Sequence, residues 1–200
     1  MGQYPIFTIT PVAMFKTRVE RSIIDYILSL KGMAKTDSFF IRAKTNYNGT
    51  TFAQSAIDLG AYVDALGKSV LRIHNITVQY GNPTDLILPV SSASVCNSFQ
   101  LTTQNQSAMV DVTDKSVIAS GKLSCIAGNT GVTTPFVTEA LDIAPQMWSA
   151  GYLVGVEQIY LGVDSTNAAN LGIDQVGIVL ECTVETLSQS AAMALALSQQ

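Results

Sequence analysis

The chain has 200 residues, of which 48% are hydrophobic and only 13% are charged, and its net charge is −4. That length suffices for one domain with a sizeable core, but the charged share is about half of the roughly 25% that is usual in soluble proteins. Short neutral side chains lose little conformational entropy and little hydration at contacts, so this composition is typical of extracellular proteins, shells and fibres. A protein with a large buried fraction would have a similar composition. No apolar run reaches the roughly 18 residues that a membrane-spanning helix needs.

Charge is distributed unevenly along the chain. Residues 1–72 contain nine of the eleven Lys and Arg residues and five acids, whereas residues 73–200 contain two basic residues and ten acids. Two faces that meet different environments would explain this asymmetry, and so would a chance fluctuation in a small set of charges.

The first part of the chain is predicted to form an arm followed by a helix. Residues 1–11 are apolar and interrupted by two prolines, which disfavours a helix there. Thr17 and Glu20 match a capping box, and apolar residues then recur at helical spacing until Gly32. The pattern predicts a helix over residues 18–31.

From residue 37 onward the pattern is that of β-strands, in which apolar and polar residues alternate between turn signals. The last strand is the clearest, because its apolar residues occupy every second position from Val176 to Val184 and include Cys182. Residues 127–150 are expected to be irregular, and the uncharged tail after Ser188 is helix-prone. The predicted strands cover residues 39–45, 70–80, 86–90, 108–113, 116–126, 152–163 and 175–185.

The predicted elements define the fold class. No strand–helix–strand alternation is present, which disfavours a parallel α/β sheet. We therefore expect a mainly β protein, an antiparallel β-sandwich of about eight strands preceded by an N-terminal arm and one α-helix. The expected division is residues 1–36 for the arm and amphipathic helix, 37–187 for the sandwich and 188–200 for a C-terminal tail, which would cap the sandwich, contact a neighbour or be mobile.

Residue types that support catalysis are scarce. His74 is the only histidine and lies within a predicted strand, and the three cysteines are 29 and 57 residues apart. Neither a zinc-ligand spacing nor a nucleophile elbow nor a phosphate-binding glycine motif is present. Glu181 and Glu185 are expected on the solvated face of the last strand. We therefore expect no enzyme activity, no metal, no cofactor and no small-molecule substrate; Cys96 and Cys125 could pair, but nothing requires it.

A group of basic residues surrounds the predicted helix, and two interpretations of it stay open. The group could contact phosphates of a nucleic acid through release of counterions, or it could be a solvated helix face on which Glu20 and Asp25 dilute the positive charge. The residues are Lys16, Arg18, Arg21, Lys31 and Lys35.

This plan of an arm followed by a strand-rich body resembles the single jelly-roll coat proteins of small icosahedral viruses. The body would begin at residues 37–40 and end near Leu187. The resemblance implies a jelly roll and a coat subunit that self-assembles with copies of itself into the closed shell of a virion. Arm and helix would dock on adjacent subunits through Tyr4, Ile6, Phe7, Ile9, Phe15, Ile23 and Ile27.

This sequence departs from the pattern of that family in the charge of its arm. Arms in that family are often strongly basic and bind the packaged genome, whereas this arm has few cations. Whether nucleic acid, a membrane or another virion protein would lie against the inner face therefore stays open.

Three other functions are weighed against a coat subunit. A secreted or surface adhesion module would have a binding loop within residues 127–150. A tail, fibre or minor capsid component would differ from a coat mainly in symmetry. A hydrolase would need His74 beside an Asp or Glu in a cleft.

Overall fold

The computed structural model describes residues 37–64, 68–87, 94–126 and 136–200. These residues form nine strands, a C-terminal helix α2 (Gln189–Ser198) and two short 3-10 helices, η1 (Pro145–Met147) and η2 (Asn170–Gly172). Within these ranges no helix is long and apolar enough to cross a membrane. The strands are β1 (Phe39–Asn46), β2 (Ala53–Asp58), β3 (Ser69–Tyr80), β4 (Val95–Thr102), β5 (Val117–Ile126), β6 (Phe136–Ile143), β7 (Tyr152–Val154), β8 (Gln158–Ser165) and β9 (Gln175–Thr186).

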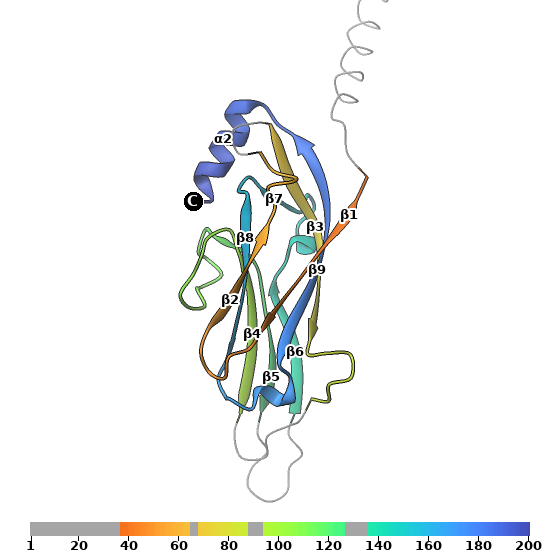
Figure 1. Ribbon diagram of the computed structural model, residues 1–200, viewed down its shortest axis with the longest axis vertical. Helices are drawn as coiled ribbons and strands as arrows, with labels where there is room; N and C mark the ends of the chain where they lie inside the picture. Colours follow the sequence, from red (N-terminus) through yellow and green to blue (C-terminus); the bar gives the residue numbers. More distant parts are fainter. Residues whose placement is uncertain (1–36, 65–67, 88–93, 127–135) are drawn as a thin grey trace, which may run out of the picture. The chain divides into compact units, whose positions relative to one another are not determined.

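The strands form two antiparallel sheets, one with the order β1-β9-β3-β7 and one with the order β2-β8-β4-β5-β6 (Figure 1). Four of the pairs are nested in the sequence: β1 pairs with β9, β2 with β8, β3 with β7 and β4 with β5. A two-stranded ribbon that is rolled up in this way is a jelly roll, and β6 adds one strand at the edge beside β5. The predicted antiparallel β-sandwich is therefore confirmed.

Strand β9 lies between β1 and β3 and sets the register of its sheet. Ile178 is the cross-strand partner of both Ala43 and Val78, and Leu180 is the partner of Ile41 and Ile76. The even-numbered apolar residues of β9, predicted to face the core, are buried, with exposed fractions of 2% or less from Val176 to Cys182. Because side chains alternate between faces, a slip of one residue would move this set out of the core.

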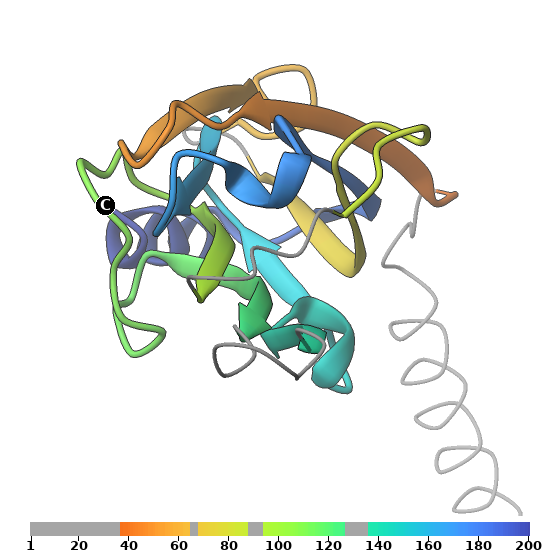
Figure 2. The same cartoon turned by 90° about the horizontal axis from the view of Figure 1, so that it is seen from below.

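The main core fills the space between the sheets, which Figure 2 views along the strands from the end opposite α2. Phe99 of β4 and Leu161 of β8 face Ile73 of β3 and Leu180 of β9 in this cluster, and all four are essentially inaccessible to solvent. A smaller cluster around Val95, Leu123 and Ile173 closes the end opposite α2.

The termini of the sandwich meet at one end. Phe39, the first residue of β1, is paired with Cys182, and β9 continues only to Thr186 before α2 begins. The β2–β3, β4–β5 and β7–β8 connections lie at this same end, which we call the α2 end (Figure 1).

One predicted strand is wrong. Residues 108–113 lie outside any strand, because the carboxylates of Asp111 and Asp114 accept hydrogen bonds from the backbone N–H groups of Thr113 and Ser116 and stabilise local turns in place of a ladder. The described part of the predicted strand 86–90, Leu86 and Ile87, is also outside any strand.

Other predictions differ from the structure in their bounds. The predicted strand 152–163 is two strands, β7 and β8, which belong to different sheets. Strands β2, β4 and β6 are additional, and β6 lies within residues 127–150, which were expected to be irregular. β4 was missed because Asn97 lies on its core-facing side, 0% exposed, and Cys96 on the other, so the first half of the strand does not alternate between apolar and polar residues.

Glu185 is also not where the sequence predicted it. Its carboxylate is only 5% exposed and receives hydrogen bonds from Nε and Nη2 of Arg72 at 2.6 and 2.8 Å. Arg72 additionally donates to the carbonyl oxygen of Ala150. Thus a two-point ion pair across β3 and β9 replaces the expected solvated face at this position.

The three cysteines are unpaired. Cys125 is the cross-strand partner of Val95, so Cys96 projects from the opposite face of the same sheet. Because their side chains project from opposite faces, Cys96 and Cys125 do not form the disulfide that the sequence left open. Cys182 lies in the core, as predicted, and burial raises the pKa of its thiol to about 12.

The chain divides into residues 1–34 and residues 35–200, and the strands and α2 belong to the second unit. The predicted arm and the predicted helix over residues 18–31 lie outside the described residues. Both stay predictions.

Replacing Arg72 by Leu is expected to lower the free energy of unfolding by about 3 kcal/mol, because the buried Glu185 carboxylate would lose both hydrogen bonds from the guanidinium. Urea unfolding followed by circular dichroism measures this. The control is Lys122→Leu, which removes a pair with Asp142 whose side chains are 48% and 34% exposed and should cost less than about 1 kcal/mol. Equal losses for the two variants would contradict this account of Arg72.

Thiol labelling of the folded protein should modify Cys96 first, because Cys125 and Cys182 are at most 1% exposed. Iodoacetamide at pH 8 followed by peptide mass spectrometry measures the order. Full labelling of all three is expected only in denaturant. A peptide in which Cys96 and Cys125 are disulfide-linked would show that the register of β4 and β5 is wrong.

Candidate assembly surface

Helix α2 follows directly from β9 and carries no charged residue. It begins at a capping residue, Ser188, whose hydroxyl accepts a hydrogen bond from the N–H of Ala191 at 3.3 Å. Ala192 and Ala196 lie on the buried side of the helix. Alanine and leucine favour a helix, so the tail's composition and its capping residue account for the element.

Gln199, directly after α2, locks the helix onto the sandwich. Its side chain accepts a hydrogen bond from the N–H of Gly155 at 2.8 Å and donates to the carbonyl oxygen of Leu153 at 2.7 Å. Its own carbonyl oxygen accepts from the hydroxyl of Thr103 at 2.9 Å. With 4% of its surface exposed, Gln199 ties α2 to strand β7, to the β7–β8 connection and to the β4–β5 connection.

Close packing against the β7–β8 connection reinforces this attachment. A β-carbon at Gly155 would lie 3.1 Å from the backbone nitrogen of Ala196 and 3.1 Å from Cγ of Leu195. Glycine is therefore the residue that lets the helix lie this close to the strand end. Hydrogen bonds and packing together make α2 a fixed part of the surface.

The outward side of α2 is uncharged and presents two large apolar side chains. Met193 is 44% exposed and Leu197 is 66% exposed, and the small residues Ser190, Ala191, Ala194 and Ser198 beside them are exposed as well. Surface helices usually carry charged or polar residues on the side that faces water. This side of α2 thus resembles a surface that contacts another protein.

Further large apolar side chains are exposed on the sandwich, most of them at connections between the strands. Tyr62, in the β2–β3 connection, stacks on Phe39 with ring centroids 4.7 Å apart. Trp148 contacts Tyr152 at a centroid distance of 5.9 Å. The described residues of this kind, besides Met193 and Leu197, are Phe40, Tyr62, Leu86, Ile87, Val112, Ile126, Met147 and Trp148.

An open groove of about 670 Å³ runs between α2 and the segment around β7. Leu195, Tyr152 and Leu153 provide its apolar lining. Its two cations are engaged within the molecule, since Arg72 is paired with Glu185 and the ammonium of Lys115 donates to the backbone carbonyl of the last residue. The groove therefore has no free cation for an anionic ligand.

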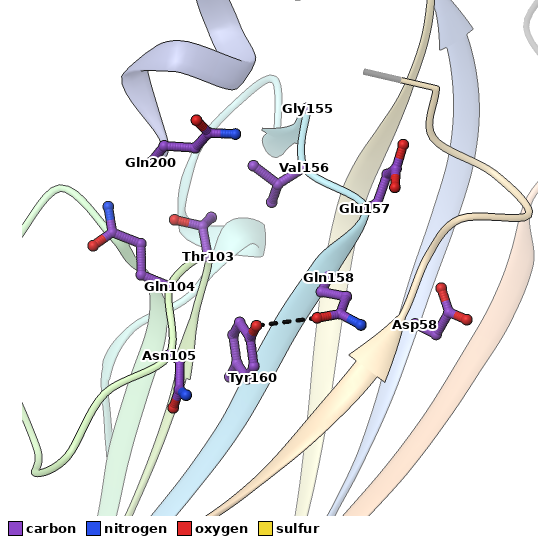
Figure 3. Close-up of a pocket in the computed structure, with 10 residues that line it drawn as sticks. All are labelled: Asp58, Thr103, Gln104, Asn105, Gly155, Val156, Glu157, Gln158, Tyr160 and Gln200. Carbon is purple, nitrogen blue, oxygen red and sulfur yellow. Dashed lines mark hydrogen bonds between the residues drawn. The ribbon is translucent and has the colours of Figure 1, made fainter. Parts of the chain in front are cut away.

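A second depression, of about 540 Å³, lies at the α2 end on the outer side of β8 (Figure 3). Asp58 and Glu157 lie on one side of it, Gln104 and Asn105 on the other, and Tyr160 between them. The Tyr160 hydroxyl donates to Gln158 at 3.1 Å. One oxygen of Asp58 is already used by the N–H of Gly60.

His74 is not placed as a catalytic base. Its Nε2 lies 2.9 Å from the hydroxyl of Thr183, the neighbouring strand's residue, rather than beside a carboxylate in a cleft. Within the described ranges, no group of three or more His, Cys, Asp or Glu residues is arranged to hold a metal ion.

All residues that the sequence nominated for assembly or for inner-face contacts lie in residues 1–36, outside the described ranges. The structure thus tests none of them. It adds the exposed side of α2, which the sequence indicated only through an uncharged, Ala- and Leu-rich tail. Gln199 gave no signal in the sequence, because its partners are 44 or more residues away.

Comparisons with known proteins give limited information. No protein-family model matches the chain, and no curated protein matches it. Among solved structures, the chain is similar to one titled Desmodium yellow mottle tymovirus, with 13% sequence identity and a TM-score of 0.33 over 93% of this chain and 96% of that one. A similarity of this size establishes no shared function, and the strand pairing by itself defines the fold class.

Replacing Gln199 by Ala should release α2, because the buried N–H of Gly155 and carbonyl of Leu153 would lose their partner. We expect the free energy needed to open α2 to fall by roughly 1–3 kcal/mol, and hydrogen exchange to become faster in α2 than in β9. Amide exchange read by mass spectrometry measures both.

The matched control is Gln200→Ala, because the last residue is exposed and the bond from Lys115 goes to its backbone. Unchanged exchange in α2 for Gln199→Ala, or the same effect from both variants, would contradict the locking role of Gln199.

Proposed function

We propose that this chain is a structural subunit, a coat protein that self-assembles into the closed shell of a virion. The observation that carries the proposal is the outward side of α2, an uncharged surface with exposed Met193 and Leu197 that is held at one end of a jelly roll. Viral coats are among the proteins that use this fold, alongside lectins and cupins. Because one fold supports many functions, the surface and not the fold is the stronger support.

Such a subunit assembles by burying a surface whose conformation is fixed before the contact forms. Gln199 and Gly155 hold α2 before any contact is made, so little conformational entropy is lost on association. Stable interfaces commonly bury at least about 1,200 Å², and repeated contacts close into a shell when the rotation between copies closes. The exposed apolar side chains at the connections provide further contacts of this kind.

We also propose that the subunit has no catalytic role, no cofactor and no small-molecule substrate. The bond of His74 to Thr183 and the use of an Asp58 oxygen by Gly60 support this view. Partners would be copies of the same chain, with other virion proteins, nucleic acid or a membrane as further candidates at the inner face.

In this proposal, residues 1–36 act as the arm that joins adjacent subunits. The sequence supports it through the apolar residues from Tyr4 to Phe15 and the predicted helix over residues 18–31. The net charge of residues 1–36 is +3, from five basic and two acidic residues, whereas residues 37–200 carry −7, from six basic and thirteen acidic residues. Opposite charge would steer the arm of one copy toward the sandwich of another.

A binding module is the second candidate, and the depression in Figure 3 favours it. Carboxylates, amides and a tyrosine are groups that hydrogen-bond to the hydroxyls of a sugar, and lectins also use jelly rolls. An adhesion module would stay monomeric and lose ligand binding on Tyr160→Ala, whereas a coat subunit would assemble whatever residue occupies position 160.

Deleting residues 1–36 should leave a folded protein that does not assemble, because the strands and the core lie entirely within residues 39–186. Circular dichroism measures the fold, and multi-angle light scattering measures the mass of the full chain and of the truncated chain. Assembly of the truncated chain at the same concentration and yield as the full chain would show that the arm does not join subunits.

A further inference from the structure

The depression of Figure 3 gathers polar groups that have no partner within the described residues. The Glu157 carboxylate and the Asn105 amide make no hydrogen bond there, and Gln158 accepts through its oxygen without using its amide nitrogen. Asp58 uses one oxygen for the N–H of Gly60, which leaves the other oxygen available. Carboxylate acceptors and amide donors thus line the same space and remain available to a ligand.

Tyr160 lies between these groups and provides an aromatic surface (Figure 3). It projects from the outer face of β8, where its cross-strand neighbours are Ala56 on β2 and Thr102 on β4. Both neighbours are short, and the tyrosine is only partly buried. The bond from its hydroxyl to Gln158 restrains the ring at 3.1 Å. Such a ring offers a flat face to C–H groups of a ligand, while its hydroxyl oxygen can still accept a hydrogen bond.

The residues around the depression determine which ligands fit it. Its volume of about 540 Å³ is within the range of small-molecule sites. None of the described residues that line it is a lysine or an arginine, and Asp58 and Glu157 would repel a negatively charged ligand. The apolar side chain in the lining, Val156, is only 8% exposed, so an apolar ligand finds little surface to bury. The ligand that fits is polar, rich in hydroxyls and without negative charge.

We infer that the depression binds a saccharide without acidic groups. One face of the sugar ring packs on Tyr160, while its hydroxyls donate to Asp58 and Glu157 and accept from the amide of Asn105. The inference goes beyond the assembly proposed above, because it requires no contact between copies. A coat subunit and an adhesion module would both hold the sugar as a ligand, without any reaction.

Saturation-transfer difference NMR on the full-length protein tests the class of ligand, since it detects binding to single subunits and to large particles. The probes are the methyl glycosides of glucose, galactose and mannose. Their matched anions are the methyl glycosides of the corresponding uronic acids, which differ only in a carboxylate at C6. Because an open depression makes few contacts, we expect a Kd of about 1–10 mM for at least one neutral sugar. Its uronic acid should bind about tenfold more weakly or worse.

Substitutions in the lining test the place of binding. Tyr160→Ala should weaken the neutral sugar by about tenfold or more, because the stacking surface is lost, and Asn105→Ala should weaken it less. The control is Trp148→Ala, which removes an exposed aromatic side chain outside the lining and should change nothing. Circular dichroism verifies that each variant folds, and Asn105→Ala, at an exposed position, tests the site even if Tyr160→Ala does not fold.

Asp58→Asn tests why acids are rejected. The amide oxygen can still accept from the N–H of Gly60, but one repelling carboxylate is gone. The difference in affinity between the neutral sugar and its uronic acid should therefore become smaller. An unchanged difference would show that Asp58 does not face the bound sugar.

Binding of a neutral sugar that Tyr160→Ala weakens and Trp148→Ala preserves supports the inference. It is overturned if no neutral sugar gives saturation transfer at about 50 mM, if the uronic acids bind as tightly, or if Tyr160→Ala and Asn105→Ala bind as well as the natural chain. Light scattering on the same samples reports assembly separately. Assembled particles that bind no sugar overturn this inference alone, whereas sugar binding by a chain that stays monomeric overturns the shell proposal alone.

Discussion

The register of β9 between β1 and β3 is the constraint on which the rest of the structure depends. Its core-facing residues from Val176 to Cys182 are the most deeply buried set in that sheet, and a slip of one residue would expose all of them. The pair of β9 with β1, which lies at the start of the sandwich, is the outermost of the nested antiparallel pairs. The jelly roll is the result of that nesting.

The same register positions the surface from which we argue function. β9 ends at Thr186, so α2 follows directly after it and packs against the β7–β8 connection. Gln199 then bonds to Gly155 and Leu153, and the close approach at Gly155 fixes the helix. The buried face of β9 and the outward side of α2 thus belong to one continuous stretch of chain.

Strands with one buried and one open face could be predicted from the sequence, as β9 and β3 illustrate. β4 could not, because polar Asn97 lies on its core-facing side, where its amide donates to the carbonyl oxygen of the remote Asn170. Glu185 has the position of a solvated residue in the alternation, and only the pairing of β3 with β9 brings Arg72 to it. For α2, composition predicted a helix, but its attachment depends on residues remote in the sequence.

Electron microscopy of the purified full-length chain tests the central claim, that this jelly roll works by packing against copies of itself. The account predicts closed particles of uniform size in which the subunits contact each other through their α2 ends. Folded single subunits at every concentration, in preparations whose circular dichroism matches a β-sandwich, would contradict it.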